Sequence, residues 1–323
     1  MHRDQTARRE FLGQIGRTGL ALAGASVGAW WLHNRPAAVD EASLALPRYA
    51  VPLGAADPRL AIVHGTAIDT MVRAAVGELG GMSRFVSAGD VVLIKPNVAF
   101  DRAPALGATT HPDILASVIR LCREAGARGV IVADNPINDP EGAFRKSGIE
   151  AAAGAAGAEV VYPRQGTFRS VKVGGLAIDT WPVFHDPLRD ATKVIGVAPA
   201  KSHNLCGASL TMKNWYGLLG GARNRLHQRI HDVVADLATL VTPTLVFLDA
   251  TRLLMTNGPT GGRLSDVVAG NTVVCGVDQV AVDAYGVTLL GGSPADVAYL
   301  ERAHARGIGS MHWSSIGYRE ITV

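Results

Sequence analysis

Lysine, histidine and amide side chains gather in one short segment of this 323-residue chain, directly behind an apolar run. Residues 193–197 have the composition of a buried strand, and Lys201, His203, Lys213 and Asn214 follow them. In open parallel sheets, ligands bind beyond the carboxyl ends of the strands, so these groups occur where chemistry is usually placed. The segment therefore predicts a functional site, and an ordinary solvent-exposed loop is the alternative.

The same kinds of residue follow other predicted strands. Lys95 and Asn97 come at the end of one strand, Asp134 follows another, and Asp249 ends a third. If the strands are parallel, these side chains meet at one edge of the sheet. The alternative is that Asp and Asn after a strand form turns and helix caps. The residues expected to bind a ligand are Lys95, Asn97, Thr110, Asp134, Asn214 and Asp249.

The chemistry expected at this edge is anion binding combined with proton transfer. Lysines can hold a carboxylate or phosphate, and we expect Lys201 and Lys213 to contribute to catalysis beside His203. A histidine pKa near 6.5 suits a general acid or base, and burial beside two lysines favours its neutral form. Cys206 lies in the same segment, where it is either a packing residue or a nucleophile.

A pair of histidines provides a second, weaker signal. His227 and His231 are four residues apart in a predicted helix, so they face the same way and could chelate one divalent metal. Asp232 and Asp236 could orient the two rings. A solvent-exposed or capping role and a contact with substrate are the alternatives. The sequence does not identify a cofactor beyond this candidate metal.

The three cysteines of the chain do not form a metal or cluster motif. Cys122, Cys206 and Cys275 are far apart in the sequence, without a C-x-x-C pair. Cys122 lies in a helix pattern and Cys275 in a strand pattern, which is typical of buried packing residues. We therefore expect neither a disulfide framework nor a cysteine-bound iron–sulfur cluster in this chain.

Strand and helix patterns alternate along most of the sequence. Strands are predicted over 91–95, 130–133, 159–162, 194–197, 244–249 and 272–274, helices over 112–125, 144–156, 226–240 and 280–290, and a hairpin over 168–179. This alternation predicts an α/β fold with a mostly parallel, Rossmann-like sheet flanked by helices. The body is expected to be either a single α/β domain or two lobes around a cleft.

The N-terminal segment has the features of a twin-arginine export signal. Arg8-Arg9 is followed by Phe11 and Leu12, and an apolar run extends over residues 18–32. We expect residues 1–45 to be signal and linker and residues 46–323 to be the α/β domain. The run is shorter than the roughly 20 residues of a membrane span, so cleavage and a periplasmic location are expected. Membrane anchoring is the alternative, since Trp30 and Trp31 suit a membrane interface.

The charge distribution excludes one class of partner. The first 39 residues hold five arginines, one aspartate and one glutamate, which accounts for the net charge of +3 of the whole chain. The remainder is therefore neutral and lacks the basic field that binds nucleic acid. The expected partners are a small anionic molecule and, during export, the twin-arginine translocase.

Several motifs resemble the family known as domain of unknown function 362, over residues 88–292. The motifs are Leu93-Ile94-Lys95-Pro96-Asn97, Thr109-Thr110-His111-Pro112, Lys201-Ser202-His203, Lys213-Asn214-Trp215-Tyr216-Gly217, His227, and Asp278 with Asp283. Some members of that family carry a ferredoxin-like iron–sulfur module, which implies redox chemistry and a redox partner. This chain shows no such module. The arrangement also resembles lactate-racemase-type proteins, which have lysines and histidines in a cleft between two α/β lobes.

These observations together predict an exported enzyme that uses acid–base chemistry, with metal assistance if the histidine pair binds an ion. Two alternatives remain open at the level of sequence. A periplasmic binding protein would use the same lysines to capture a small molecule without converting it. A redox or iron–sulfur-associated accessory protein would depend on a partner for its cluster.

Overall fold

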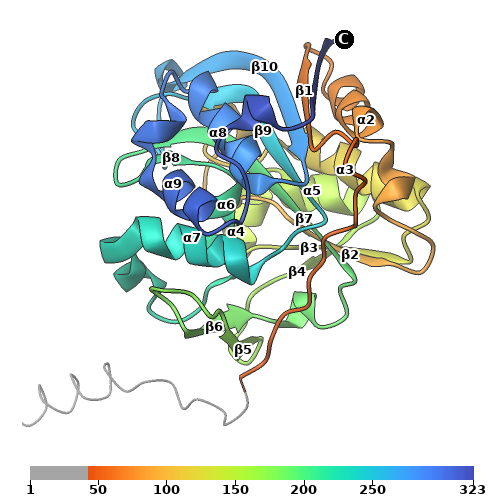
Figure 1. Ribbon diagram of the computed structural model, residues 1–323. Coiled ribbons are helices and arrows are strands. Elements are labelled where there is room, and N and C mark those ends of the chain that lie inside the picture. Colours follow the sequence, from red (N-terminus) through yellow and green to blue (C-terminus); the bar gives the residue numbers. More distant parts are fainter. Residues whose placement is uncertain (1–42) are drawn as a thin grey trace, which may run out of the picture. The chain divides into compact units, whose positions relative to one another are not determined.

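Buried strands alternate with helices in the computed structural model of the chain, which describes residues 43–323 (Figure 1). The Arg8-Arg9 pair and the apolar run behind it lie outside the described residues. The strands form where β-branched and aliphatic residues follow one another. Val91–Lys95, for example, is buried at every position, as expected for a strand covered on both faces.

The main sheet has nine strands, in the order β11-β1-β10-β9-β7-β2-β3-β4, with β8 paired to β7. Within the described residues, β10 and β8 are antiparallel to their partners and the other pairs are parallel. The strands are β1 Leu60–His64, β2 Val91–Lys95, β3 Gly129–Ala133, β4 Glu159–Val161, β7 Lys193–His203, β8 Gly207–Ser209, β9 Leu245–Leu254, β10 Val267–Gly276 and β11 Tyr318–Thr322. The predicted α/β fold with a mostly parallel sheet is therefore confirmed.

The order of the strands reverses between β2 and β7. From β2 the chain proceeds to β3 and β4 on one side, whereas β7, on the other side of β2, leads to β9 and β10. The connections therefore leave the carboxyl ends of β2 and β7 in opposite directions. Such a topological switch point opens a crevice, and it is where α/β proteins of this kind bind their ligands.

Helices cover both faces of the sheet (Figure 1). One face packs against α2 Ile68–Glu78, α3 Pro112–Glu124, α4 Pro140–Lys146 and α5 Ile149–Ala155. The other packs against α6 Thr211–Asn214, α7 Ile230–Leu240, α8 Gln279–Leu289 and α9 Ala298–Ala305. Alternate residues of β2 belong to the two cores, with Val92 and Ile94 in one and Leu93 in the other.

Several predicted elements differ in their bounds. The helix expected over 144–156 is two helices, α4 and α5, because Gly148 has a left-handed φ of 73° between them. The helix expected over 226–240 begins with the 3-10 segment Arg223–Arg229 before α7. The predicted hairpin pairs β5 Phe168–Lys172 with β6 Thr180–Phe184 as a separate two-stranded sheet.

Residues 43–323 form one compact unit. The sequence patterns did not predict β1, α2, α9 or β11, which complete the sheet edge and its helical cover. No helix in the described part of the chain has the length and apolar character that a membrane span requires.

Candidate functional site

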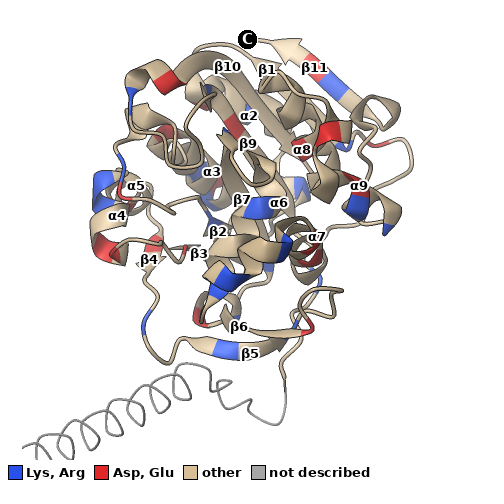
Figure 2. Cartoon of the chain, turned by 90° about the vertical axis from the view of Figure 1, so that its left-hand side faces the viewer, with Lys and Arg blue, Asp and Glu red and all other residues tan. Residues whose placement is uncertain are grey.

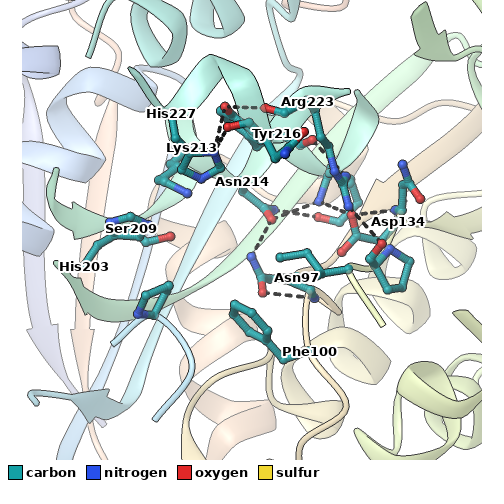
Figure 3. Close-up of a pocket in the computed structure, with 18 of the residues that line it drawn as sticks. Asn97, Phe100, Asp134, His203, Ser209, Lys213, Asn214, Tyr216, Arg223 and His227 are labelled. Carbon is teal, nitrogen blue, oxygen red and sulfur yellow. Dashed lines mark hydrogen bonds and ion pairs between the residues drawn. The ribbon is translucent and has the colours of Figure 1, made fainter. Parts of the chain in front are cut away.

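A cavity of about 340 Å³ lies at the switch point of the sheet (Figure 3). Its walls come from the ends of β2 and β7, the loop after β3, the helix α6 and the 3-10 segment that precedes α7. The residues that line it are Lys95, Asn97, Ala99, Phe100, Asp134, Asn135, Pro136, Ile137, Lys201, His203, Ser209, Lys213, Asn214, Tyr216, Gly217, Gly221, Arg223, Asn224, His227 and Pro259. Segments that are far apart in the sequence thus converge on one pocket.

Positive charge predominates in this pocket. Its lining contains Lys95, Lys201, Lys213 and Arg223, and the carboxylate among these residues is Asp134. Elsewhere the acidic and basic residues are interspersed over the described elements (Figure 2). The excess of cations is therefore a local property of the pocket, which suits an anionic ligand.

A chain of buried hydrogen bonds crosses the floor of the pocket. Nζ of Lys201 donates to Oδ1 of Asn97 at 3.2 Å, and Nδ2 of Asn97 donates to Oδ1 of Asn214 at 3.1 Å. The same Oδ1 accepts from Nζ of Lys95 at 2.9 Å, and Lys95 pairs with Oδ1 of Asp134 at 2.7 Å. The predicted residues Lys95, Asn97, Asp134, Lys201 and Asn214 therefore belong to one network.

Lys95 has no free N–H group to offer a ligand. Its ammonium group contacts three acceptors, the carboxylate of Asp134, the carbonyl of Pro96 and the side chain of Asn214. Asp134 also accepts from the backbone N–H of Val98 at 2.6 Å and of Asn135 at 2.9 Å. The pair therefore stabilises the loops around the pocket, and each hydrogen of the Lys95 ammonium group already has an acceptor in this arrangement.

Lys201 differs from Lys95 in the number of its acceptors, because its amino group contacts only two among the described residues. Nζ donates to Oδ1 of Asn97 and to the carbonyl of Ala108, the latter at 2.7 Å. The Phe100 ring lies 5.2 Å from Nζ and shields it from water. Burial, reinforced by the charge of Lys213, lowers the pKa of Lys201 to about 7. Lys201 can therefore exchange a proton near neutral pH.

Lys213 differs from the other cations of the pocket because its charged group has no polar partner among the described residues. Its Nζ has no hydrogen-bond or ion-pair partner within residues 43–323, and it lies 5.0 Å from the centre of the Tyr216 ring. Burial lowers the pKa of Lys213. An unpaired, largely desolvated ammonium group is costly unless an anion approaches it.

The buried carboxyl group of Asp283 fixes the helix that carries Lys213 and Asn214. It accepts from the backbone N–H groups of Thr211 and Met212, at 2.8 and 3.0 Å, and from the Thr211 hydroxyl. Burial raises the pKa of Asp283 to about 7. This residue acts on the pocket through α6, whereas the sequence singled it out solely as part of a family motif.

His203 lies in the pocket but is not suited to act as a general base. Its Nδ1 accepts a hydrogen bond from the backbone N–H of Leu205 at 3.1 Å, so Nε2 carries the hydrogen. Burial, followed by the charges of Lys213 and Lys201, lowers the pKa of His203 to about 3. The ring is neutral, as expected, yet its lone pair is occupied, and Nε2–H is a hydrogen-bond donor.

His227 has the opposite tautomer. Its Nδ1 contacts the carbonyl of Asn224 at 3.1 Å, and because a carbonyl can only accept, Nδ1 carries the hydrogen. The lone pair is then on Nε2. His227 lines the pocket with its ring 5.1 Å from that of Tyr216 (Figure 3). Burial lowers the pKa of His227, so its neutral, proton-accepting form predominates.

The histidine pair predicted to bind a metal does not share one site. His231 is not among the pocket residues, and its ring stacks 6.4 Å from that of Tyr299. His227 is in the 3-10 segment, and Arg229 departs from helical geometry before α7 begins, so the two histidines do not lie on one continuous α-helix. Within residues 43–323 no group of three or more His, Cys, Asp or Glu side chains could hold a metal ion.

The acidic residues predicted to orient these histidines have other partners. Asp232 pairs with Arg302 at 2.7 Å. Asp236 is fully buried, accepts from the backbone N–H groups of residues 176–178 and pairs with Arg306 at 2.7 Å. Asp236 thus holds the loop between β5 and β6, and both expectations are wrong.

Two predicted ligand residues lie outside the pocket lining. The Thr110 hydroxyl donates to the carbonyl of Val197 and accepts from the backbone N–H of Asn97, so it supports the pocket from behind. Asp249 accepts from the backbone N–H of His111 at 2.8 Å and from the Thr251 hydroxyl at 2.6 Å. Asp249 therefore connects β9 to the segment before α3, and it is not among the residues that line the pocket.

The three cysteines are buried thiols outside the pocket lining. Burial raises the pKa of Cys206 to about 11, and its Sγ donates to the carbonyl of Ala208. A thiol in this state is a poor nucleophile, which favours the packing alternative.

Other pocket residues were not predicted as site residues. Among them are Phe100, Ser209, Tyr216 and Arg223. The Arg223 guanidinium donates to the carbonyls of Pro136, Leu219 and Tyr216, so it connects the walls of the pocket. Tyr216 and Arg223 could have been found from their positions, next to Lys213-Asn214 and in the glycine-rich, basic segment that follows.

Residues 92–288 match the family described as Domain of unknown function (DUF362). The chain belongs to this family. The resemblance expected from its motifs over residues 88–292 is therefore confirmed. A curated relative, a thylakoid-associated protein of Synechocystis sp. (strain ATCC 27184 / PCC 6803 / Kazusa), is 26% identical over 226 residues, which are 66% of this chain and 68% of the relative.

Two solved structures are similar at 12% identity. One is the lactate racemase apoprotein from Thermoanaerobacterium thermosaccharolyticum, with a TM-score of 0.40 over 76% of this chain and 61% of that chain. The other is a protein from Thermotoga maritima, with a TM-score of 0.38 over 75% of this chain and 60% of that chain. The similarity to each thus spans less than two thirds of the solved chain.

Proposed function

We propose that this protein is an exported enzyme that binds a small anionic molecule in the switch-point pocket and performs acid–base chemistry on it. The observation that carries the proposal is the ammonium group of Lys213, which lies in a cation-rich pocket without a counter-charge among the described residues. A carboxylate or phosphate there would form a charge-assisted hydrogen bond and offset the desolvation of the lysine.

The size of the pocket limits the ligand. A cavity of about 340 Å³ is near the lower end of the range for small-molecule sites. Phe100, Ile137 and Pro259 supply apolar surface, while Lys213 and the Nε2–H of His203 supply donors. This combination favours a small organic anion over an extended polymer.

Two groups in the pocket have the properties needed for proton transfer. The pKa of Lys201 is lowered to about 7, and His227 has its lone pair on Nε2. A catalytic acid or base works best when its pKa is near the operating pH. We therefore assign proton transfer to Lys201 and His227, and substrate hydrogen bonding to His203.

Calorimetric titration of the full chain with acetate, lactate and phosphate tests the proposal. The Lys213→Met variant should lose about tenfold or more in affinity for the anion that binds, since a charge-assisted contact contributes at least ~1.4 kcal/mol. Lys172→Met is the matched control, because Lys172 is exposed and pairs with Asp179 outside the pocket lining. Equal affinities of wild type and Lys213→Met would contradict the proposal.

Turnover distinguishes the enzyme from a periplasmic binding protein. Incubation of the bound anion with wild-type protein and with Lys201→Met, followed by NMR spectroscopy, should show conversion by the wild type alone. Binding without conversion would favour the binding-protein alternative. Recovery of the native protein with iron or a reductase would favour the redox accessory alternative.

Export through the twin-arginine route is proposed from Arg8-Arg9 and the apolar run that follows. Replacing both arginines with lysine should leave the protein in the cytoplasm with its leader attached, while a variant with Arg35→Lys should be exported normally. Periplasmic delivery of the double variant at the wild-type level would contradict this route.

A further inference from the structure

We propose that Lys201 is a Schiff-base lysine, whose amino group condenses with the carbonyl carbon of a small oxo acid while Lys213 holds the carboxylate of that acid. The inference rests on the proposed anion site and specifies the substrate class and the covalent step. It starts from a difference between two buried lysines of the same pocket, Lys95 and Lys201.

The number of acceptors around each lysine matches a different protonation state. Nζ of Lys95 has three acceptors, one for each hydrogen of an ammonium group. Nζ of Lys201 has two acceptors, Oδ1 of Asn97 and the carbonyl of Ala108, which satisfy the two hydrogens of a neutral amine. In the neutral form, the lone pair of Lys201 is then left for an electrophile in the pocket.

The orientation of the Asn97 amide is fixed by the network. Lys95 can only donate, so the atom of Asn214 that it contacts is an oxygen, and the Asn97 atom that faces this oxygen must be Nδ2. Oδ1 of Asn97 therefore faces Lys201. Both partners of Lys201 are neutral acceptors, and no carboxylate contacts its amino group to retain the proton.

The electrostatic surroundings act in the same direction. Burial and the charges of Lys213 and Lys95 favour loss of the proton, while the more distant charge of Asp134 opposes it. The Phe100 ring at 5.2 Å also attracts an ammonium group, but this attraction is smaller than the cost of desolvating a fully buried charge. A neighbouring cation and an apolar pocket are the conditions that activate a lysine as a nucleophile.

The sheet places hydrogen-bond donors beside Lys201. His203 is two residues further along β7, so it is on the same face of the strand, and Ser209 of β8 is the register partner of Lys201. Figure 3 shows His203, Ser209 and Lys213 on one side of the pocket. The Nε2–H of His203 and the Ser209 hydroxyl can donate to a carbonyl oxygen, and Lys213 can bind the adjoining carboxylate.

The covalent step needs no oxidant or reductant. The nitrogen lone pair of Lys201 attacks the carbonyl carbon, a C–N bond forms, and the carbonyl oxygen takes a proton to give a carbinolamine. The C–O bond then breaks. The two hydrogens of the amine leave with that oxygen as one water molecule, and a C=N bond remains. His227, with its lone pair on Nε2, can carry protons between nitrogen and oxygen.

Reductive trapping tests the step on the full-length protein. Pyruvate plus cyanoborohydride should add the mass of one reduced pyruvate to the wild type, and peptide mapping should locate it at Lys201. Lys201→Met should lose the adduct, whereas Lys172→Met should retain it. Lactate, which has the carboxylate but no carbonyl group, should give no adduct.

The role of Lys213 is tested by the concentration dependence of the same reaction. Lys213→Met should raise the pyruvate concentration for half-maximal trapping about tenfold or more, while Lys201 is still modified at saturation. An unchanged concentration dependence would contradict the carboxylate assignment to Lys213.

The outcomes separate this inference from the proposed function. One outcome is that pyruvate binds in calorimetry while neither pyruvate nor glyoxylate forms an adduct at Lys201 in the trapping reaction. In that case the Schiff-base inference is wrong and the anion site stands. If neither trapping nor binding of any anion occurs, the anion site is wrong as well. An adduct spread over several surface lysines would also overturn the inference.

Discussion

Asn97 donates from Nδ2 to Oδ1 of Asn214 across 3.1 Å, and this bond separates two buried lysines that have different surroundings. On one side Lys95 is saturated by three acceptors, including a carboxylate. On the other side Lys201 has two neutral acceptors. The amide side chains of Asn97 and Asn214 are neutral. The carboxylate of Asp134 therefore pairs with Lys95 and does not contact Lys201.

The variant Asn97→Asp tests this arrangement. A carboxylate 3.2 Å from Nζ of Lys201 would stabilise its ammonium form and raise the pKa of Lys201. Because the pKa of Lys201 starts at about 7, a rise of one unit lowers the neutral fraction at pH 7 about fivefold, so trapping by pyruvate at neutral pH should fall by about fivefold or more. Raising the pH should restore trapping in this variant, and failure to recover would indicate that the substitution damaged the pocket instead.

Gly217 is the position where the backbone must approach the Lys95–Asp134 pair most closely. A Cβ atom there would lie 1.9 Å from Oδ1 of Asp134 and 2.7 Å from Nζ of Lys95. Gly217→Ala should therefore displace the pair and destabilise the protein by about 3 kcal/mol or more, since it disrupts a buried ion pair. Urea unfolding and anion titration measure the two consequences.

Gly77→Ala is the matched control for this substitution. Gly77 is in α2 with open space around the added Cβ, so the change should be neutral or stabilise the helix by about 0.5–1 kcal/mol. Equal stabilities of the two variants would show that the backbone at Gly217 can relax away from the pair.

The sequence identified the site because strand ends carry its residues and parallel strands place their ends at one edge. Lys201 and His203 line the pocket for this reason, because they are at the end of β7, whereas Lys213 reaches the pocket from α6. The state of each group could not be predicted, because it depends on partners distant in the sequence. Lys95 is saturated by Asn214, 119 residues away, and a strand-end pattern contains no information about that bond.

Local backbone geometry at the histidine pair differs from the predicted α-helix. A spacing of four residues places side chains on one face in an α-helix, but residues 223–229 form a 3-10 helix that ends before α7 begins. Strand β1 and the edge strand β11 were missed for a different reason. Each pairs with a partner far along the chain, β1 with β10 and β11, so their formation depends on tertiary contacts more than on local pattern.

Asp249, which was predicted at a strand end but lies within β9 and outside the pocket lining, provides a further test. Asp249→Asn should lower the free energy of unfolding by about 1–3 kcal/mol. The carboxylate now accepts from the N–H of His111 and from the N–H and hydroxyl of Thr251, and the amide NH₂ of asparagine would face one of these two donor sets. Anion affinity should stay within about twofold of wild type, a change of less than ~0.5 kcal/mol. A large loss of affinity in a variant that remains folded would show that Asp249 acts on the ligand.

The buried amine of Lys201 also predicts a pH dependence of stability. Its pKa is about 7 in the folded protein and near 10.5 in the unfolded chain, so between these values the unfolded state binds more protons. Stability due to this group therefore rises with pH from about 7 to about 10.5, and below about 7 the full cost of burying the ammonium group is present. The difference of about 3.5 pKa units corresponds to roughly 4–5 kcal/mol.

In Lys201→Met this contribution is absent. The substitution leaves Oδ1 of Asn97 and the carbonyl of Ala108 without their donor, a cost of about 1–3 kcal/mol each that does not vary with pH. The stability of the variant relative to wild type should therefore be greatest below about pH 7. This relative stability should fall by several kcal/mol as the pH approaches about 10, because the wild type becomes more stable over that range. Urea unfolding of both proteins across this range measures the difference, and the exposed-lysine variant Lys172→Met should show none of it. A difference between Lys201→Met and wild type that is constant with pH would mean that Lys201 keeps an ordinary lysine pKa in the fold, and the amine would then be an ammonium group at neutral pH.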